Sequence, residues 1–263
     1  MKLAIIGGGN MGGAIARGLV ASGTFAAADI TLAGPHREVL DKVAETAPGI
    51  VTMTDNAVAI KGADVIILAV KPWVLPAVLE EIAPRIAFRE QSIVSLAAGI
   101  SLADIDAMLH RYSSDRTLFR AMPNTAMSVG SSMTFICHDG ASQKNISDVV
   151  AIFDRLGSTA VIEERLMGAA TALCSCGIAY VMRYVRAATE GAVELGLYPD
   201  KARDYMLATM KGAVALLEAT GNNPEVEIDK VTTPGGITIK GLNAMEAHGF
   251  TTAVIEGLKA SAK

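Results

Sequence analysis

Three glycines close to the amino terminus have the spacing that binds the phosphates of a dinucleotide. Gly7, Gly9 and Gly12 fit the pattern G-x-G-x-x-G, with Asn10 and Met11 before the last glycine. The motif follows an expected strand and opens an expected helix, a context that favours a phosphate site over a merely structural glycine turn. There Gly7 would permit the tight turn, Gly9 would let the backbone approach a pyrophosphate, and Gly12 would let the helix pack on the strand. The free N–H groups at the helix start would attract the phosphates.

The segment at the end of the second expected strand predicts which dinucleotide binds. A site for NAD usually places an acidic residue there, about 20 residues after the glycines. This chain has Gly34-Pro35-His36-Arg37 instead, and Arg37 is placed to meet a 2′-phosphate with its paired donors. His36 could touch the same phosphate. The segment favours NADP(H), with NAD(H) left open by Glu38 and an exposed surface arginine as the alternative interpretation of Arg37.

Short apolar runs in the first part of the chain are the elements that must position these residues. They are expected to be strands of a parallel sheet, because continuous apolar runs suit strands covered on both faces. Helical segments such as 12–22 and 74–82 lie between them, and this alternation predicts a Rossmann-like doubly wound α/β sheet. The expected strands are 3–6, 30–33, 50–52, 65–70, 92–95 and 117–120, extended by 133–136 and 159–162.

After about Glu163 the strand pattern stops and helical spacing takes over. We therefore expect two domains, a dinucleotide-binding domain over 1–162 and an all-α domain over 163–263. The helix expected over 177–195 carries small or apolar residues on most sides, and such a helix needs partners on more than one side. A domain of only about 100 residues is small, so a second subunit is expected to supply one of them. This predicts a homodimer or higher homo-oligomer through the carboxy-terminal helices.

Composition excludes several other classes of protein. The chain has 263 residues, 51% of them hydrophobic and 19% charged, which is enough apolar surface to build a core. The net charge of −4 and the lack of basic runs argue against a nucleic-acid partner. No unbroken apolar run approaches the roughly 20 residues of a membrane span, and no signal peptide is expected, because the apolar run over 3–6 is too short for one. Three cysteines cannot form a disulfide framework, so a cytoplasmic location is expected.

Three further motifs follow the glycines in a characteristic order: Ala69-Val70-Lys71-Pro72, Met122-Pro123-Asn124-Thr125 and Thr233-Pro234-Gly235-Gly236-Ile237-Thr238. Together the four motifs resemble pyrroline-5-carboxylate reductase over essentially the whole chain. The resemblance implies reduction of the cyclic imine 1-pyrroline-5-carboxylate to L-proline by NADPH or NADH, the last step of proline biosynthesis. It also implies an amino-terminal Rossmann domain and a carboxy-terminal helical domain that interlocks into dimers.

The resemblance further implies roles for individual residues. Those implied to surround the cofactor, beyond the glycine motif, are Asn56, Ala69, Val70, Lys71, Pro72, Met122 and Asn124. Those implied to hold the substrate are Thr233, Gly235, Gly236, Ile237 and Thr238. In this arrangement Thr238 faces the ring nitrogen of the imine.

Hydride transfer to a protonated C=N bond asks mainly that the protein position two partners and bind one carboxylate. Gly235 and Gly236, before a helix expected over 237–247, would offer bare N–H groups to that carboxylate. The Thr238 hydroxyl is the candidate catalytic group, through a hydrogen bond to the imine nitrogen. An ordinary helix-start turn is the alternative interpretation. The nucleotide platform and this turn must converge on one cleft, within or between protomers.

The chain departs from the family pattern in four places, the first of which borders the expected substrate pocket. Gly-Ser-Gly-Pro-Ala-Tyr of the family becomes Ser175-Cys176-Gly177-Ile178-Ala179-Tyr180, Ala126 replaces a proline, Ile237 stands where many members have threonine, and the loop after the second strand is Gly-Pro-His-Arg instead of Asn-Arg-Ser. Three alternatives therefore stay open: a reductase of a related cyclic imine, an enzyme like the β-hydroxyacid dehydrogenases, and a non-catalytic NADP-binding sensor. No metal site is expected, because Cys174 and Cys176 lack the further ligands that zinc requires.

Overall fold

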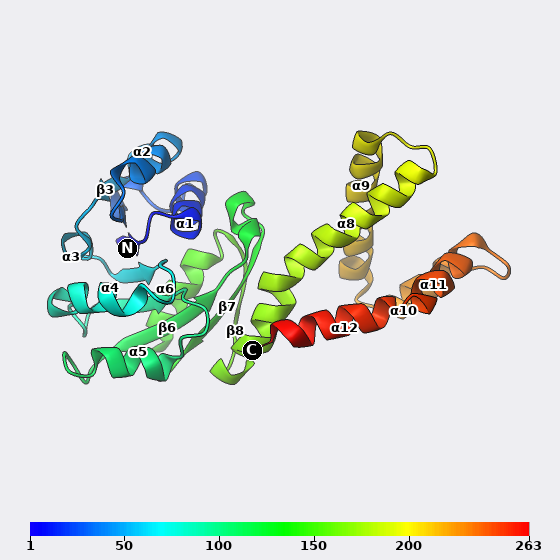
Figure 1. The fold of residues 1–263 in the computed structure, drawn as a ribbon. Helices are drawn as coiled ribbons and strands as arrows, with labels where there is room; N and C mark the ends of the chain where they lie inside the picture. The colour runs from blue at the N-terminus through cyan, green and yellow to red at the C-terminus, as the bar shows by residue number, and fades with distance from the viewer. Residues whose placement is uncertain (263) are drawn as a thin grey trace. The chain divides into compact units, whose positions relative to one another are not determined.

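The computed structural model describes residues 1–262, which form two compact units, Met1–Ser175 and Cys176–Ala262 (Figure 1). This division falls after the boundary expected at 162/163. The reason is that the short helix α7 (Met167–Ala170), which follows η4 (Glu164–Leu166), contacts β7 of the sheet. Met167 belongs to the core of the first unit, and a Glu164 carboxylate oxygen accepts a hydrogen bond from the backbone N–H of Leu102 at 2.7 Å.

The first unit is an eight-stranded sheet in the order β3-β2-β1-β4-β5-β6-β7-β8, parallel except where β6 meets β7. The strands are β1 (Leu3–Ile6), β2 (Ile30–Ala33), β3 (Val51–Met53), β4 (Val65–Leu68), β5 (Ser92–Ser95), β6 (Thr117–Met122), β7 (Ser132–His138) and β8 (Gly157–Val161). All eight expected strands are present, and the predicted doubly wound fold is confirmed. β4 ends at Leu68 instead of residue 70, because the chain turns away there into the 69–72 loop.

Alternate residues of the central strands enter two separate cores, one on each face of the sheet. In β1, Ala4 and Ile6 point to one core, whereas Leu3 and Ile5 point to the other. A strand with both faces covered must be apolar at every position, which explains why β1 and β4 appear in the sequence as unbroken apolar runs.

Helices cover both faces of this sheet (Figure 1). α4 (Leu75–Ile82) and α5 (Leu102–Leu109) contribute to the core that contains Ile6, and α1 (Asn10–Ala21), α2 (Arg37–Thr46) and α6 (Gln143–Phe153) contribute to the core that contains Ile5. The remaining short elements are α3 (Asn56–Ala59), the 3-10 turns η1 (Ala27–Asp29), η2 (Ala83–Arg85) and η3 (Thr125–Val129), and a π-helix, Thr171–Cys176.

The second unit consists of five helices and almost no core of its own. They are α8 (Gly177–Glu194), α9 (Pro199–Thr220), α10 (Pro224–Val231), α11 (Ile237–Ala247) and α12 (Phe250–Ser261). α8 pairs with α9, and the Tyr180 hydroxyl donates to the Gly257 carbonyl of α12 at 3.2 Å. Within residues 176–262 only Gly177 and Ala202 are buried. An all-helical unit with so little buried apolar surface needs another surface to cover it.

The helical segment Glu164–Glu194 is long and apolar enough, by length and composition alone, to cross a membrane. The segment contains no long unbroken apolar run, because small and polar residues interrupt it. Only 17% of its most apolar window is buried. Large side chains that it leaves exposed are Leu166, Leu173, Tyr180, Val181, Met182, Tyr184 and Val193. The expectation of a chain without a membrane partner stays a prediction.

Candidate active site

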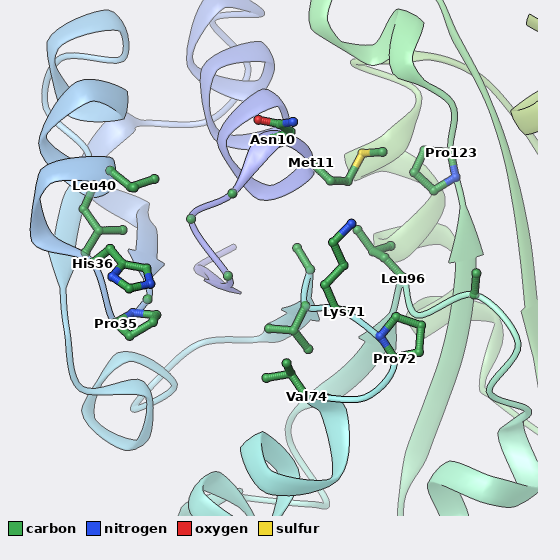
Figure 2. Close-up of a pocket in the computed structure, with 18 of the residues that line it drawn as sticks. Asn10, Met11, Pro35, His36, Leu40, Lys71, Pro72, Val74, Leu96 and Pro123 are labelled. Atoms are coloured by element: carbon green, nitrogen blue, oxygen red, sulfur yellow. The ribbon is translucent and has the colours of Figure 1, made fainter. Parts of the chain in front are cut away.

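A pocket of about 550 Å³ lies beside the glycine motif, where β1, β2, β4, β5 and β6 end (Figure 2). In open parallel sheets, ligands bind at the carboxyl ends of the strands where the strand order reverses. Here β1 has β2 on one side and β4 on the other, so this pocket lies at that point. Its lining includes ten of the residues expected around the cofactor: Gly7, Gly9, Asn10, Met11, His36, Ala69, Val70, Lys71, Pro72 and Met122.

The three motif glycines meet different surroundings. A Cβ added to Gly7, whose φ is +112°, would lie 2.5 Å from the Ala69 carbonyl oxygen, and one added to Gly12 would collide with the carbonyl oxygen of Gly7. These two positions therefore require glycine for the close packing of turn, strand and helix. A Cβ on Gly9 would meet nothing within 4 Å. The Gly9 backbone faces open space, as a ligand-contacting position requires.

The start of α1 is prepared for an anion. Its N-cap is Gly9, whose lack of a side chain leaves the first N–H groups uncapped, and its first turn holds no acidic residue. These N–H groups and the positive end of the helix dipole both favour phosphate. Together with the open backbone at Gly9, they fit the pyrophosphate of a dinucleotide.

At the end of β2, the pocket is lined by His36 and not by Arg37. Gly34 and Pro35 also line it. The Arg37 Nε donates instead to a carboxylate oxygen of Asp41, one turn further along α2, at 2.9 Å, and its side chain is 62% exposed. Arg37, which was expected to meet a 2′-phosphate, thus pairs with Asp41 along the surface of α2, whereas His36 lines the pocket.

Asn124 lies beside the pocket without lining it. Its side-chain oxygen accepts from the N–H of Ala126 at 3.0 Å, and its amide nitrogen donates to the Cys174 carbonyl at 3.4 Å. Asn124 thereby caps η3 and holds the turn that presents Met122 and Pro123 to the pocket. The Ser175 hydroxyl reinforces this turn by donating to the Pro123 carbonyl at 2.8 Å.

Asn56, expected at the cofactor ribose, also does not line the pocket. Its amide nitrogen donates to a carboxylate oxygen of Glu81 at 2.9 Å, whereas its side-chain oxygen is buried without a hydrogen-bond partner among residues 1–262. A buried acceptor of this kind is costly unless a donor reaches it.

Several pocket residues were not expected from the sequence. Gly34, Pro35 and Pro123 lie within motifs quoted above but were given no role, whereas Val39, Leu40, Val74, Leu96 and Ala98 belong to no motif and line the pocket through position alone. Leu96 and Ala98 follow β5, and the rule that ligands bind where parallel strands end could have found them.

The turn expected to hold the substrate has a defined geometry within the second unit. The N–H of Gly236 donates to the Thr233 carbonyl at 2.9 Å, with Pro234 and a left-handed Gly235 (φ +72°) between them, as in a type II turn. Gly236 is the N-cap of α11 and has no side chain to cap it. Ile237 and Thr238 are exposed at the start of that helix. The turn therefore presents uncapped N–H groups and a hydroxyl, which suit a carboxylate.

Burial affects two cysteines and one ion pair near the sheet. Burial raises the pKa of the Cys137 thiol to about 11, and it also raises the pKa of Cys174. Arg120, on the neighbouring strand, is buried and pairs with Glu164 at 2.7 Å. Among residues 1–262, no group of three or more histidines, cysteines or acids could hold a metal ion.

A doubly wound sheet with a glycine cradle at its switch point defines a dinucleotide-dependent oxidoreductase. Two family models match this chain: NADP oxidoreductase coenzyme F420-dependent over residues 2–99, and pyrroline-5-carboxylate reductase dimerisation over residues 164–263. The chain belongs to the pyrroline-5-carboxylate reductase family.

Individual relatives support this membership. Pyrroline-5-carboxylate reductase of Synechocystis is 36% identical, over 99% of this chain and 96% of that protein. Pyrroline-5-carboxylate reductase 1 of Dictyostelium discoideum is also 36% identical, over 98% of this chain, which spans about half (48%) of that protein. The crystal structure of pyrroline carboxylate reductase from Plasmodium falciparum, with NADP bound, superposes with a TM-score of 0.89 at 26% identity. It covers 100% of this chain and 95% of that one.

Proposed function

We propose that this chain reduces the C=N bond of 1-pyrroline-5-carboxylate to form L-proline, with NADPH as the preferred donor and NADH as an alternative. The observation that best supports this proposal is the phosphate-binding cradle, formed by residues 7–12 and the uncapped start of α1 and open at Gly9. It occurs in a chain whose full-length relatives are pyrroline-5-carboxylate reductases. The reaction would complete proline biosynthesis.

The protein's part in this reaction is mainly positioning. The uncapped N–H groups at the start of α1 would hold the cofactor pyrophosphate, and the Met122–Pro123 turn, held by Asn124, would border the nicotinamide. The bound nicotinamide supplies the hydride. The remaining residues proposed at the cofactor are Gly7, Asn10, Met11, Gly12, His36, Arg37, Asn56, Ala69, Val70, Lys71 and Pro72.

The Thr233–Thr238 turn would bind the substrate. The N–H groups of Gly235 and Ile237, on either side of Gly236, would hold its carboxylate, because a helix start favours an anion. The Thr238 hydroxyl would accept a hydrogen bond from the iminium N–H and so orient the ring. The nitrogen already carries its proton, so hydride arrival at carbon completes the amine and no further acid is required.

Assembly and location are part of the proposal. The apolar side chains exposed on α8 and α9 support a homodimer or higher homo-oligomer through the carboxy-terminal helices. We infer a cytoplasmic location, supported by three free cysteines, with a small-molecule substrate and no nucleic-acid or membrane partner.

One assay tests the proposed reaction against its alternatives. Purified protein is mixed with NADPH and 1-pyrroline-5-carboxylate, and the absorbance band of reduced nicotinamide is followed while proline is measured. Proline formed in step with NADPH loss is expected. NADPH binding without turnover would favour a sensor, and turnover only of a six-membered imine or of a β-hydroxyacid would favour the other reductases.

A further inference from the structure

A second cavity, of about 250 Å³, adjoins the first and has no role in the reaction proposed above. Asn10 and Met11 line both cavities. Ala14 and Arg17 continue the same face of α1, because residues three and four positions apart lie together on a helix. The opposite wall is η3, through Thr125, Met127 and Ser128.

Arg17 is unusual among the arginines of this chain. It is half-buried, and no ion pair or hydrogen bond joins its guanidinium to another of residues 1–262. Every other arginine in that range either pairs with a carboxylate or is exposed. A guanidinium partly withdrawn from water without a partner costs free energy that a bound anion would offset.

The direction of the Arg17 side chain increases this cost. A Cβ added to Gly13 would lie 3.1 Å from an Arg17 Nη atom, so the guanidinium folds back toward the start of α1 and depends on the missing side chain at Gly13. The start of α1 already carries the positive end of the helix dipole, without an acidic residue in the first turn. A second positive charge placed there is unfavourable unless an anion is present.

The rest of the lining suits an oxyanion. The cavity wall contains no carboxylate, and Asn10, Thr125 and Ser128 bring an amide and two hydroxyls that can donate. The Ser128 hydroxyl donates at present to the Thr125 carbonyl at 3.0 Å. The volume holds a group of a few atoms with some water, because one water molecule takes about 30 Å³ in the liquid.

We propose that this second cavity is an anion subsite in which Arg17 binds a small oxyanion, a phosphate or a carboxylate, beside the cofactor pocket. The guanidinium supplies paired N–H donors, the geometry that both kinds of oxyanion accept. The subsite is distinct from the pyrophosphate cradle, which uses the backbone of the first turn. It is independent of the reaction proposed above.

Calorimetric titration with inorganic phosphate, at constant ionic strength, tests the subsite. The protein is titrated alone and again when saturated with NADPH, and sodium acetate replaces phosphate in a parallel series. The variant is Arg17→Gln, and the matched control is Arg85→Gln, which removes an unpaired but exposed arginine of η2. Ser128→Phe, which fills the cavity from an exposed position, is a second variant in case Arg17→Gln does not fold.

We expect saturable binding of phosphate or acetate to the wild type and to Arg85→Gln, with and without NADPH. Arg17→Gln and Ser128→Phe should weaken it by about tenfold or more, the loss expected for charge-assisted hydrogen bonds. The tighter of the two probes identifies the source of the anion. No saturable binding, or equal binding by all variants, would overturn the subsite. So would loss of the Arg17-dependent binding in the protein saturated with NADPH, since Arg17 would then serve the cofactor itself.

Discussion

At the scale of single residues, Thr238 is the side chain to which the proposed chemistry assigns a direct role. It is exposed at the start of α11, so its replacement should not disturb packing. We expect Thr238→Ala to lower turnover roughly tenfold, the effect of losing one hydrogen bond to the reacting group, and to leave NADPH affinity unchanged. Thr252→Ala, at an exposed position of α12, is the control. Steady-state kinetics with unchanged turnover would remove Thr238 from the mechanism.

The preference between cofactors depends on two adjacent residues, and the structure separates them. His36 lines the pocket, whereas Arg37 is engaged with Asp41. We therefore expect His36→Ala to reduce the NADPH affinity relative to NADH by about tenfold, and Arg37→Ala to reduce it less. Fluorescence titration with both dinucleotides measures this ratio. A larger loss of NADPH affinity in Arg37→Ala than in His36→Ala would mean that Arg37, as the sequence indicated, binds the 2′-phosphate.

At the scale of elements, two glycines of the turn between β1 and α1 have different roles. Gly12 is needed for the packing of the turn, whereas Gly9 is expected to be needed for cofactor binding. Gly12→Ala should lower the melting temperature, because its Cβ collides with the backbone of Gly7. Gly9→Ala should keep the wild-type melting temperature, because its Cβ meets only open space and its φ of −68° suits any residue. Gly9→Ala should also lower the affinity for NADPH by about tenfold, because the added methyl group lies where the pyrophosphate must approach the backbone. Equal NADPH affinity in Gly9→Ala and wild type would place the cofactor elsewhere.

The buried Cys137 on β7 should make the fold less stable at alkaline pH. Burial raises the pKa of Cys137 from 9.0 to about 11, so the folded protein keeps a proton that the unfolded chain releases first. Its contribution to stability is complete below pH 9 and is lost as the pH rises through 11. Cys137→Ala should flatten the fall of the melting temperature in that interval. In the wild type, Cys137 should resist thiol labelling at pH 9 until the protein is denatured, and prompt labelling of the native protein would contradict this.

At the scale of the whole molecule, the second unit depends on assembly. Met182 on α8 is 60% exposed in the protomer, and Tyr180, Val181 and Tyr184 beside it are also exposed. A partner's helices covering this face would exclude a charge, so Met182→Glu should dissociate the oligomer and lower the melting temperature. Light scattering after gel filtration measures the mass. Lys211→Glu, which changes charge at an already charged and exposed position of α9, is the control. An unchanged mass for Met182→Glu would exclude this face as the interface.

Local sequence determined the doubly wound sheet and the cradle. Unbroken apolar runs such as 65–68 suit strands covered on both faces, and the close contact between Gly12 and the carbonyl oxygen of Gly7 lies within one short segment of the chain. Tertiary structure decided which of these residues meet. The Arg37–Asp41 pair lies within one helix, four residues apart, whereas the two walls of the second cavity, α1 and η3, come together from more than 100 residues apart. A cavity between elements that are distant in sequence has no local pattern, because its walls meet only in the folded chain.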